Sequence, residues 1–173
     1  MPRTSRFVAV VCSLFVTGSA AAQVQQFGIQ PTPEGVGPIR FGMTLAEASK
    51  ALGRRVVVDD STEACTFADI DISGHRFSFM VEDRRLVRVD FYDDTTVTTT
   101  AGARIGMIED SLKLLYRGHI RVERHAYEEE GHYIIYVPPT DSSRRIVFET
   151  SRGRVFRWRA GLHPPVEYVE GCA

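Results

Sequence analysis

One short motif occurs twice in this sequence, and that duplication is what most constrains the fold. Arg40-Phe41-Gly42-Met43 recurs 64 positions later (104 − 40 = 64) as Arg104-Ile105-Gly106-Met107. Each copy is followed by one amphipathic stretch that ends near a glycine. After each stretch the spacing of apolar residues changes from a helical period to a period of two. We therefore expect two successive units, each a short helix followed by antiparallel strands.

The first amphipathic stretch carries the signals that begin and end a helix. Thr44 and Glu47 have the T-x-x-E spacing of a capping box, and Gly53 suits the left-handed residue that ends a helix. The second stretch lacks this cap, because Ile108 stands where the first has Thr44. The predicted apolar faces are Leu45, Ala48 and Leu52 in the first helix and Ile108, Leu112, Leu115 and Tyr116 in the second.

Alternating apolar and polar residues predict one β-hairpin in each unit. The hairpins are expected at 76–81 and 86–92, and at 145–149 and 154–159. Further strands are expected at 133–137 and near 55–58 and 120–126. The sequence thus predicts an α+β fold, in which two tandem units of a short helix and antiparallel strands place their helices on one face of the sheet or sheets.

The N-terminus has the pattern of a secretory signal. Arg3 and Arg6 precede an apolar run at 7–16, and Ala20–Ala22 provide a cleavage site. The run is too short to span a bilayer, which needs about 20 apolar residues. Cys12 lies inside this run and is expected to be removed with it, with a lipid anchor as the minor alternative. The protein is therefore expected to be periplasmic or secreted, with cleavage after Ala22.

The rest of the chain divides into a leader and one domain. Residues 1–22 are the predicted signal peptide, and 23–36 are interpreted as a flexible leader because Pro and Gly interrupt any periodicity. Residues 37–173 are long enough for one core and are predicted to form a single α+β domain. Its two repeats are expected at about 37–100 and 101–173.

Two cysteines remain after the signal, Cys65 and Cys172. In an oxidising compartment such a pair predicts a disulfide, which here would tie the C-terminus to the first unit. The alternative is a catalytic thiol. Cys172 is the penultimate residue and Cys65 has no histidine nearby in sequence, so the structural interpretation is favoured.

The side of the sheet opposite the helices is the predicted binding face. Phe77, Phe79, Val87, Val89 and Phe91 are expected to point inward, which leaves their neighbours facing outward. The candidate binding face consists of Met80, Arg88, Asp90, Tyr92, Glu149, Arg157 and Arg159. Arginine, tyrosine and methionine are enriched at protein interfaces. The alternative is a solvated sheet face with no partner.

No pattern of catalytic or metal-binding residues is present. The sequence lacks G-x-S-x-G, a P-loop, H-E-x-x-H and C-x-x-C. His119, His125 and His132 are spaced six and seven apart, which suits neither a helical nor a strand metal site, and they are interpreted as solvent or turn residues. We therefore predict no catalytic residues, no metal and no cofactor. A formal charge of −1 also argues against a nucleic-acid partner.

The first unit resembles a family of small bacterial envelope proteins. Gly42-Met43-Thr44, Ala48 and Leu52-Gly53 are similar to the G-M-T motif of the SmpA/OmlA-type outer-membrane assembly lipoproteins and of the tandem-repeat β-lactamase inhibitor protein superfamily. The resemblance implies a helical segment followed by an antiparallel sheet, two such units in the inhibitor proteins, and a protein-binding role. The second copy departs from the motif, since it has lost the threonine.

Three functional hypotheses follow. The first is an exported envelope module that binds another envelope or extracellular protein through the exposed sheet face, as an inhibitor or assembly factor does. The second is a protein that binds a small ligand or cell-wall glycan. The third is an exported hydrolase with carboxylates that the sequence does not reveal. We adopt the first, without enzymatic activity, without nucleic acid as a partner and without stable membrane insertion after the signal is removed.

Overall fold

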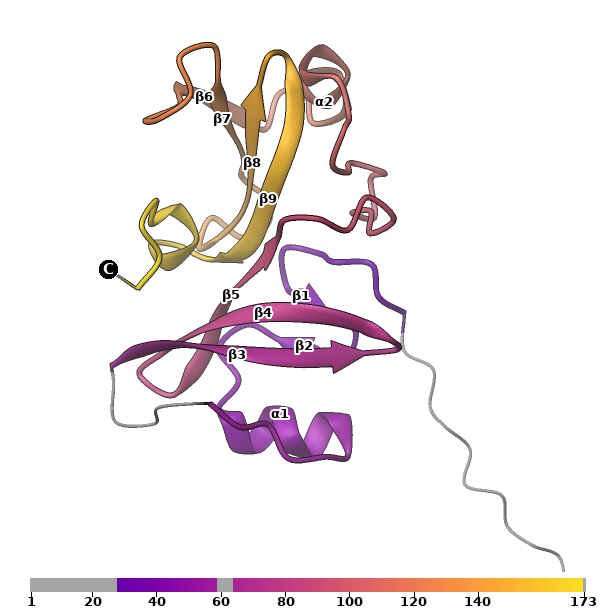
Figure 1. The fold of residues 1–173 in the computed structure, drawn as a ribbon, viewed down its shortest axis with the longest axis vertical. Coiled ribbons are helices and arrows are strands. Elements are labelled where there is room, and N and C mark those ends of the chain that lie inside the picture. Colours follow the sequence, from indigo (N-terminus) through magenta and orange to yellow (C-terminus); the bar gives the residue numbers. More distant parts are fainter. Residues whose placement is uncertain (1–27, 59–63, 173) are drawn as a thin grey trace, which may run out of the picture.

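The structure, a computed structural model, describes residues 28–58 and 64–172 and has a mixed α+β architecture dominated by antiparallel strands (Figure 1). A seven-stranded sheet has the order β3-β4-β5-β9-β8-β7-β6, and β1 and β2 form a separate two-stranded sheet. The strands are β1 Gly35–Val36, β2 Ile39–Arg40, β3 Cys65–Ile72, β4 His75–Glu82, β5 Arg85–Phe91, β6 Ile120–Arg124, β7 His132–Tyr136, β8 Arg144–Ser151 and β9 Arg154–Leu162. The helices are α1 Leu45–Leu52, α2 Glu109–Leu115 and the 3-10 helix η1 Pro165–Glu167.

Both α-helices pack on one face of the large sheet. Ala48 of α1 and Leu112 of α2 belong to the main hydrophobic cluster, together with sheet residues such as Phe79, Phe148 and Trp158. The capping box of α1 is confirmed, since Thr44 N–H donates to Glu47 Oε2 at 2.8 Å and Glu47 N–H donates to Thr44 Oγ1 at 3.2 Å. These contacts begin α1 in the position from which it covers the sheet.

The expected apolar face of α2 is only half correct. Leu112 and Tyr116 are buried, but Ile108 and Leu115 are exposed. The helix has only seven residues and begins after Ile108 without a side-chain cap, so it is too short to bury a full stripe.

The hairpins β4–β5 and β8–β9 have the same backbone plan. The turn residues Asp83 and Arg84 of the first have φ of 48° and 63°, and Arg152 and Gly153 of the second have φ of 50° and 73°. Each first strand shifts register two residues before its end, between Met80/Val81 in β4 and between Glu149/Thr150 in β8. One consequence was not expected: Leu86 joins Val89 and Phe91 in the main cluster, because the shift places an extra residue, Val87, between Leu86 and Arg88.

Both copies of the Gly-Met motif bond to these hairpins in matched ways. In the first, the contacts are Gly42 N–H to Leu86 O (2.7 Å), Leu86 N–H to Met43 O (2.9 Å) and Arg85 Nη1 to Gly42 O (2.8 Å). In the second, they are Gly106 N–H to Val155 O (2.7 Å), Val155 N–H to Met107 O (2.9 Å) and Arg154 Nη1 to Gly106 O (2.9 Å). Gly42 and Gly106 have φ of 92° and 84°, a backbone that favours glycine. Each copy of the motif therefore bonds its hairpin to the segment just before the helix and keeps the two elements side by side.

Several boundaries differ from the sequence prediction. Gly35 and Val36, assigned to a flexible leader, form β1, and Val36 is fully buried. No strand forms at 55–58, whereas β3 was not predicted, although Ala68, Ile70 and Ile72 alternate with acidic residues. The strand expected within 120–126 is β6. The predicted signal peptide, residues 1–22, lies outside the described residues.

The other face of the sheet is covered by the C-terminal segment. After β9 the chain turns through η1 and runs across this face to Cys172, which forms a disulfide with Cys65 at the start of β3 (Figure 1). Val166 of η1 packs with Tyr133, Ile135 and Val147 in a second, smaller cluster. The predicted disulfide is thus confirmed. Within 28–58 and 64–172, no helix is long and apolar enough to cross a membrane.

Candidate functional site

The seven predicted face residues do lie on one face of the sheet. Strand pairing places Met80 opposite Arg88, Asp90 opposite Arg159 and Glu149 opposite Arg157, so their side chains emerge on the same side. Tyr92 follows Asp90 at a spacing of two. This is the side that lies opposite the helices, as the alternation predicts.

Their predicted exposure is wrong for most of them. Met80, Arg88, Asp90, Glu149 and Arg159 are buried. Tyr92 remains 46% exposed, and the Arg157 side chain 32%. The C-terminal segment covers the face, an arrangement that strand alternation cannot reveal because it depends on residues after the last strand. A broad, flat interface on this face is therefore excluded while the segment is in place.

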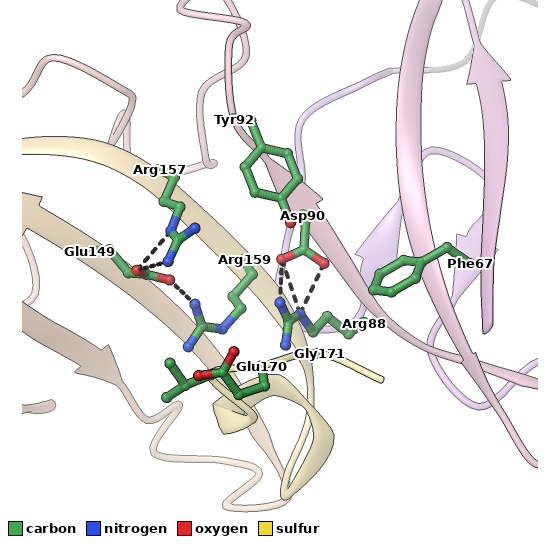
Figure 2. A pocket seen from close by; sticks show the side chains of 10 residues that line it. Phe67, Arg88, Asp90, Tyr92, Glu149, Arg157, Arg159, Glu170 and Gly171 are labelled. Atoms are coloured by element: carbon green, nitrogen blue, oxygen red, sulfur yellow. Dashed lines mark hydrogen bonds and ion pairs between the residues drawn. The ribbon is translucent and has the colours of Figure 1, made fainter. Parts of the chain in front are cut away.

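A cavity remains between the sheet and the covering segment. It has a volume of about 280 Å³ and contains six of the seven predicted face residues, all but Met80 (Figure 2). The lining residues are Phe67, Arg88, Asp90, Tyr92, Glu149, Arg157, Arg159, Val169, Glu170 and Gly171. Three guanidinium groups and three carboxylates meet here, so the formal charge of the lining is balanced.

Arg88 holds one side of the cavity and the covering segment together. Its Nε lies 3.0 and 2.9 Å from the two oxygens of Asp90, and its Nη2 lies 2.6 Å from Asp90 Oδ1. Its Nη1 donates to the carbonyl oxygens of Tyr168 at 2.7 Å and Pro165 at 3.3 Å. Every nitrogen of Arg88 is thus engaged, and its role in the closed structure is to anchor the segment.

Glu149 is the centre of the other side. Arg157 binds its Oε2 through Nε at 2.7 Å and Nη2 at 2.6 Å, while Arg159 Nη1 binds its Oε1 (Figure 2). Arg159 Nε also donates to Val166 O at 2.6 Å, which ties η1 to the sheet. His125 Nε2 lies 2.8 Å from Glu149 Oε2.

The proton on His125 can be assigned from its neighbours. The backbone N–H groups of Tyr127 and Glu128 point to His125 Nδ1 at 3.1 and 3.0 Å. Nδ1 must therefore accept, so the ring proton lies on Nε2 and is donated to Glu149. His125 lies in the connection between β6 and β7, as a turn residue would, but it is buried, so its interpretation as a solvent residue was wrong. Its partner Glu149 is 24 positions away, and no local pattern could have revealed it.

Electrostatics keep Glu149 ionised. Burial raises the pKa of Glu149, but hydrogen bonding by Arg157, the charge of Arg159 and the bond from His125 outweigh it, so the pKa is lowered. In contrast, burial and the neighbouring Asp90 raise the pKa of Tyr92, which keeps its hydroxyl protonated. A carboxylate held in this way is a poor general acid, because that role needs a raised pKa.

The mouth of the cavity is formed by Tyr92, Arg157 and Glu170. Arg157 uses Nε and Nη2 on Glu149, and among the described residues no hydrogen bond is recorded for its Nη1. Glu170 Oε1 accepts a hydrogen bond from the hydroxyl of Tyr127. The mouth can thus offer guanidinium and phenol donors beside a carboxylate acceptor. Glu170 was not among the predicted residues, since it belongs to the segment whose path the sequence does not show.

Comparisons with known proteins identify no family. No family model and no curated protein matches the chain. One solved structure, an extracellular protein containing a SCP domain from Bacillus anthracis str. Ames, is similar with a TM-score of 0.45 and 10% identity. The match covers 71% of this chain and 44% of that one, so the chain spans less than half the length of the structure it matches.

Proposed function

We propose that the protein is an exported binding module without catalytic chemistry, and that it holds a compact polar group at the mouth of the cavity. The observation that carries this proposal is the meeting of six predicted face residues in one cavity whose rim residues, Tyr92 and Arg157, stay accessible. Ligand sites combine a concave surface with a few convergent polar groups. The signal-like N-terminus and the disulfide support export.

The hydrogen-bonding groups at the rim limit the kinds of ligand that the site can bind. Arg157 and Tyr92 donate hydrogen bonds and Glu170 accepts them, so the group must carry both acceptor oxygens and N–H or O–H donors. Sugars and peptide units have this character. The group could be supplied by another envelope or extracellular protein, which is the partner that the sequence predicts, or by a cell-wall glycan fragment. In both cases the contact is at the cavity mouth and not over the whole sheet face.

A hydrolase is not supported. Hydrolysis by paired carboxylates needs one carboxyl group that is protonated near neutral pH. Glu149, the buried carboxylate at the centre of the arginine cluster, has a lowered pKa and does not suit this role. Within the described parts of the chain, no group of three or more metal-ligand side chains is found.

We also propose that the two halves are copies of one structural unit, as the resemblance to the tandem-repeat β-lactamase inhibitor proteins implies. Support comes from the matched bonds between each Gly-Met motif and its hairpin, and from the matching turn and register shift of the two hairpins. A strong test is to exchange the turn and bulge segments between hairpins, because equivalent units should accept the exchange and still fold.

Arg157→Gln tests the binding proposal. The variant keeps a similar length but loses the rim guanidinium, and a hydrogen bond to a charged group contributes about 1.5–3 kcal/mol, so affinity should fall at least roughly tenfold. The oxidised mature protein is crosslinked in envelope extract, and in parallel it is titrated with muropeptides by calorimetry. Arg55→Gln is the matched control, since Arg55 is exposed and does not line the cavity.

The crosslinking and the calorimetry distinguish a protein partner from a glycan ligand. A protein captured by wild type and by Arg55→Gln, but lost with Arg157→Gln, supports a protein partner. Saturable heat with muropeptides and the same loss supports a glycan ligand. A partner or ligand that binds Arg157→Gln as well as wild type overturns the site, and no binding in either arm overturns the proposed function.

A further inference from the structure

Strand β6 ends the large sheet, and its outer edge pairs with no strand of the described chain. In the sheet order β6 follows β7 and has no neighbour beyond it (Figure 1). The opposite edge strand, β3, is partly protected. Arg54 Nη2 binds the Asp71 carbonyl, which points away from β4 to the outer edge. An unprotected edge presents backbone donors and acceptors to another chain.

The ladder between β6 and β7 shows which backbone groups are free. Val137 N–H donates to His119 O at 2.9 Å, and His125 N–H donates to Gly131 O at 3.0 Å. Bonded and non-bonded residues alternate along an antiparallel strand. The odd-numbered residues from His119 to His125 therefore bond to β7, and Ile120, Val122 and Arg124 direct their N–H and C=O groups to the outer edge.

The sequence of β6 is complementary to itself. Ile120-Arg121-Val122-Glu123-Arg124 has a valine at its centre with opposite charges on either side. When two such strands pair antiparallel with Val122 at the two-fold axis, Arg121 of each copy lies opposite Glu123 of the other. Opposite charges in such positions stabilise a sheet, and like charges destabilise it.

We propose that β6 pairs with β6 of a second copy of this chain, joining two seven-stranded sheets across a two-fold axis. The outward groups of Ile120, Val122 and Arg124 form the ladder, as this register requires. Val122, 43% exposed in the single chain, covers its counterpart. Isologous contact of one patch with itself is the commonest way in which identical chains associate.

The charges also select this register over its neighbours. Shifting the axis by one residue keeps the same backbone groups in the ladder but places Arg121 opposite Arg121, or Glu123 opposite Glu123. In the single chain, Arg121 Nε lies 2.6 Å from Glu123 Oε1. In the proposed register the four charges of two copies alternate in sign, so both carboxylates have an arginine on each chain. One strand pair is a small interface, so association should depend on concentration.

Charge reversal at one residue tests the register. Full-length mature protein with its disulfide intact is examined by sedimentation velocity over a series of concentrations. Glu123→Arg places only positive charges at the axis and should raise the dimer dissociation constant at least about tenfold. Arg55→Glu changes the net charge by two units in the opposite direction at an exposed site outside β6 and should leave the dimer unchanged.

Mixing distinguishes a lost interface from a damaged fold. Arg121→Glu should also stay monomeric alone, but it is complementary to Glu123→Arg, so a mixture of the two should form a heterodimer. The double variant Arg121→Glu/Glu123→Arg should restore self-association. Wild type that is monomeric at every concentration overturns the proposal, as does a dimer that survives Glu123→Arg or a mixture that fails to associate.

Discussion

The two hairpins of the sheet share one backbone plan and differ in the side chains that they present to the C-terminal segment. Both have a left-handed two-residue turn, a register shift in the first strand and the same bonds to a Gly-Met motif. At the register shift, however, β4 carries Met80 and β8 carries Glu149. Both are buried, each opposite an arginine, Arg88 or Arg157.

This difference shows that the residues that determine the backbone of the sheet are not the residues that form the candidate site. Turns and glycines determine the hairpin geometry, so the side chains on the covered face can vary without changing the backbone. In the first half the segment is held by a disulfide and by Arg88. In the second it is held by Arg159, whose charge is balanced by Glu149. The candidate site lies where these two modes of attachment meet.

Breaking the covalent attachment should have the largest effect. Cys65 and Cys172 are 107 positions apart, and chain entropy assigns a loop of this length about 4–5 kcal/mol of stability. Cys65→Ser/Cys172→Ser should therefore lower the free energy of unfolding by about that amount, measured by urea denaturation. Proteolysis should also cut first in the C-terminal segment. A loss below about 1 kcal/mol would mean that the ionic attachment alone suffices.

Breaking the ionic attachment should have the next largest effect. Glu149→Ala leaves Arg159 buried without its carboxylate, and removing one partner of a buried ion pair costs about 3–5 kcal/mol. Met80→Leu is the matched change in the first hairpin, where an apolar exchange of similar volume costs less than about 1.5 kcal/mol. Equal losses in urea denaturation would show that the two positions do not differ in the way proposed.

The ion pairs of Glu149 with Arg157 and Arg159 also predict a smaller effect that depends on pH. The pKa of Glu149 is lower in the folded chain than its ordinary value of 4.5, so its ionised form stabilises the fold. That contribution is complete above the unfolded-state pKa and is lost as the pH falls through the folded-state pKa. Urea midpoints measured between about pH 6 and pH 2 should fall with acidification in wild type and in Met80→Leu, and less steeply in Glu149→Ala. Parallel curves for all three would remove Glu149 from this role.

Local patterns predicted both α-helices and the hairpins β4–β5 and β8–β9, because helices and hairpins are encoded locally. The capping box at Thr44 and Glu47 and the shared face of Arg88 and Arg157 follow from spacing alone. The disulfide followed from the two cysteines that remain after an export signal. Strand alternation identified six residues that line the cavity.

Burial of that face could not be predicted in the same way. It depends on the path of the segment that contains Val166 and Glu170, which is set by contacts with strands far away in the sequence. The register shift could not be predicted from strand alternation either. It places Leu86 in the main hydrophobic cluster, where Val87 was expected. His125 looked like a solvent residue because its partner Glu149 lies in a different strand.

The smallest predicted effect compares the two turns directly. Arg84 and Gly153 both end their turns with positive φ, but only Arg84 has a Cβ, and a left-handed residue with a Cβ costs about 1–2 kcal/mol. A Cβ at Gly153 would meet no atom within 4 Å, so Gly153→Ala tests backbone strain without a clash and should lower stability by about 1 kcal/mol. Arg84→Gly is the reverse change, since it relieves that strain of about 1–2 kcal/mol but adds unfolded-state entropy of about 0.5–1 kcal/mol, so it should raise stability by about 0.5–1 kcal/mol. Thermal melts should therefore show a decrease of about 2–3 °C for Gly153→Ala and an increase of similar size for Arg84→Gly. A loss of stability in both variants would contradict the backbone strain assigned to Arg84.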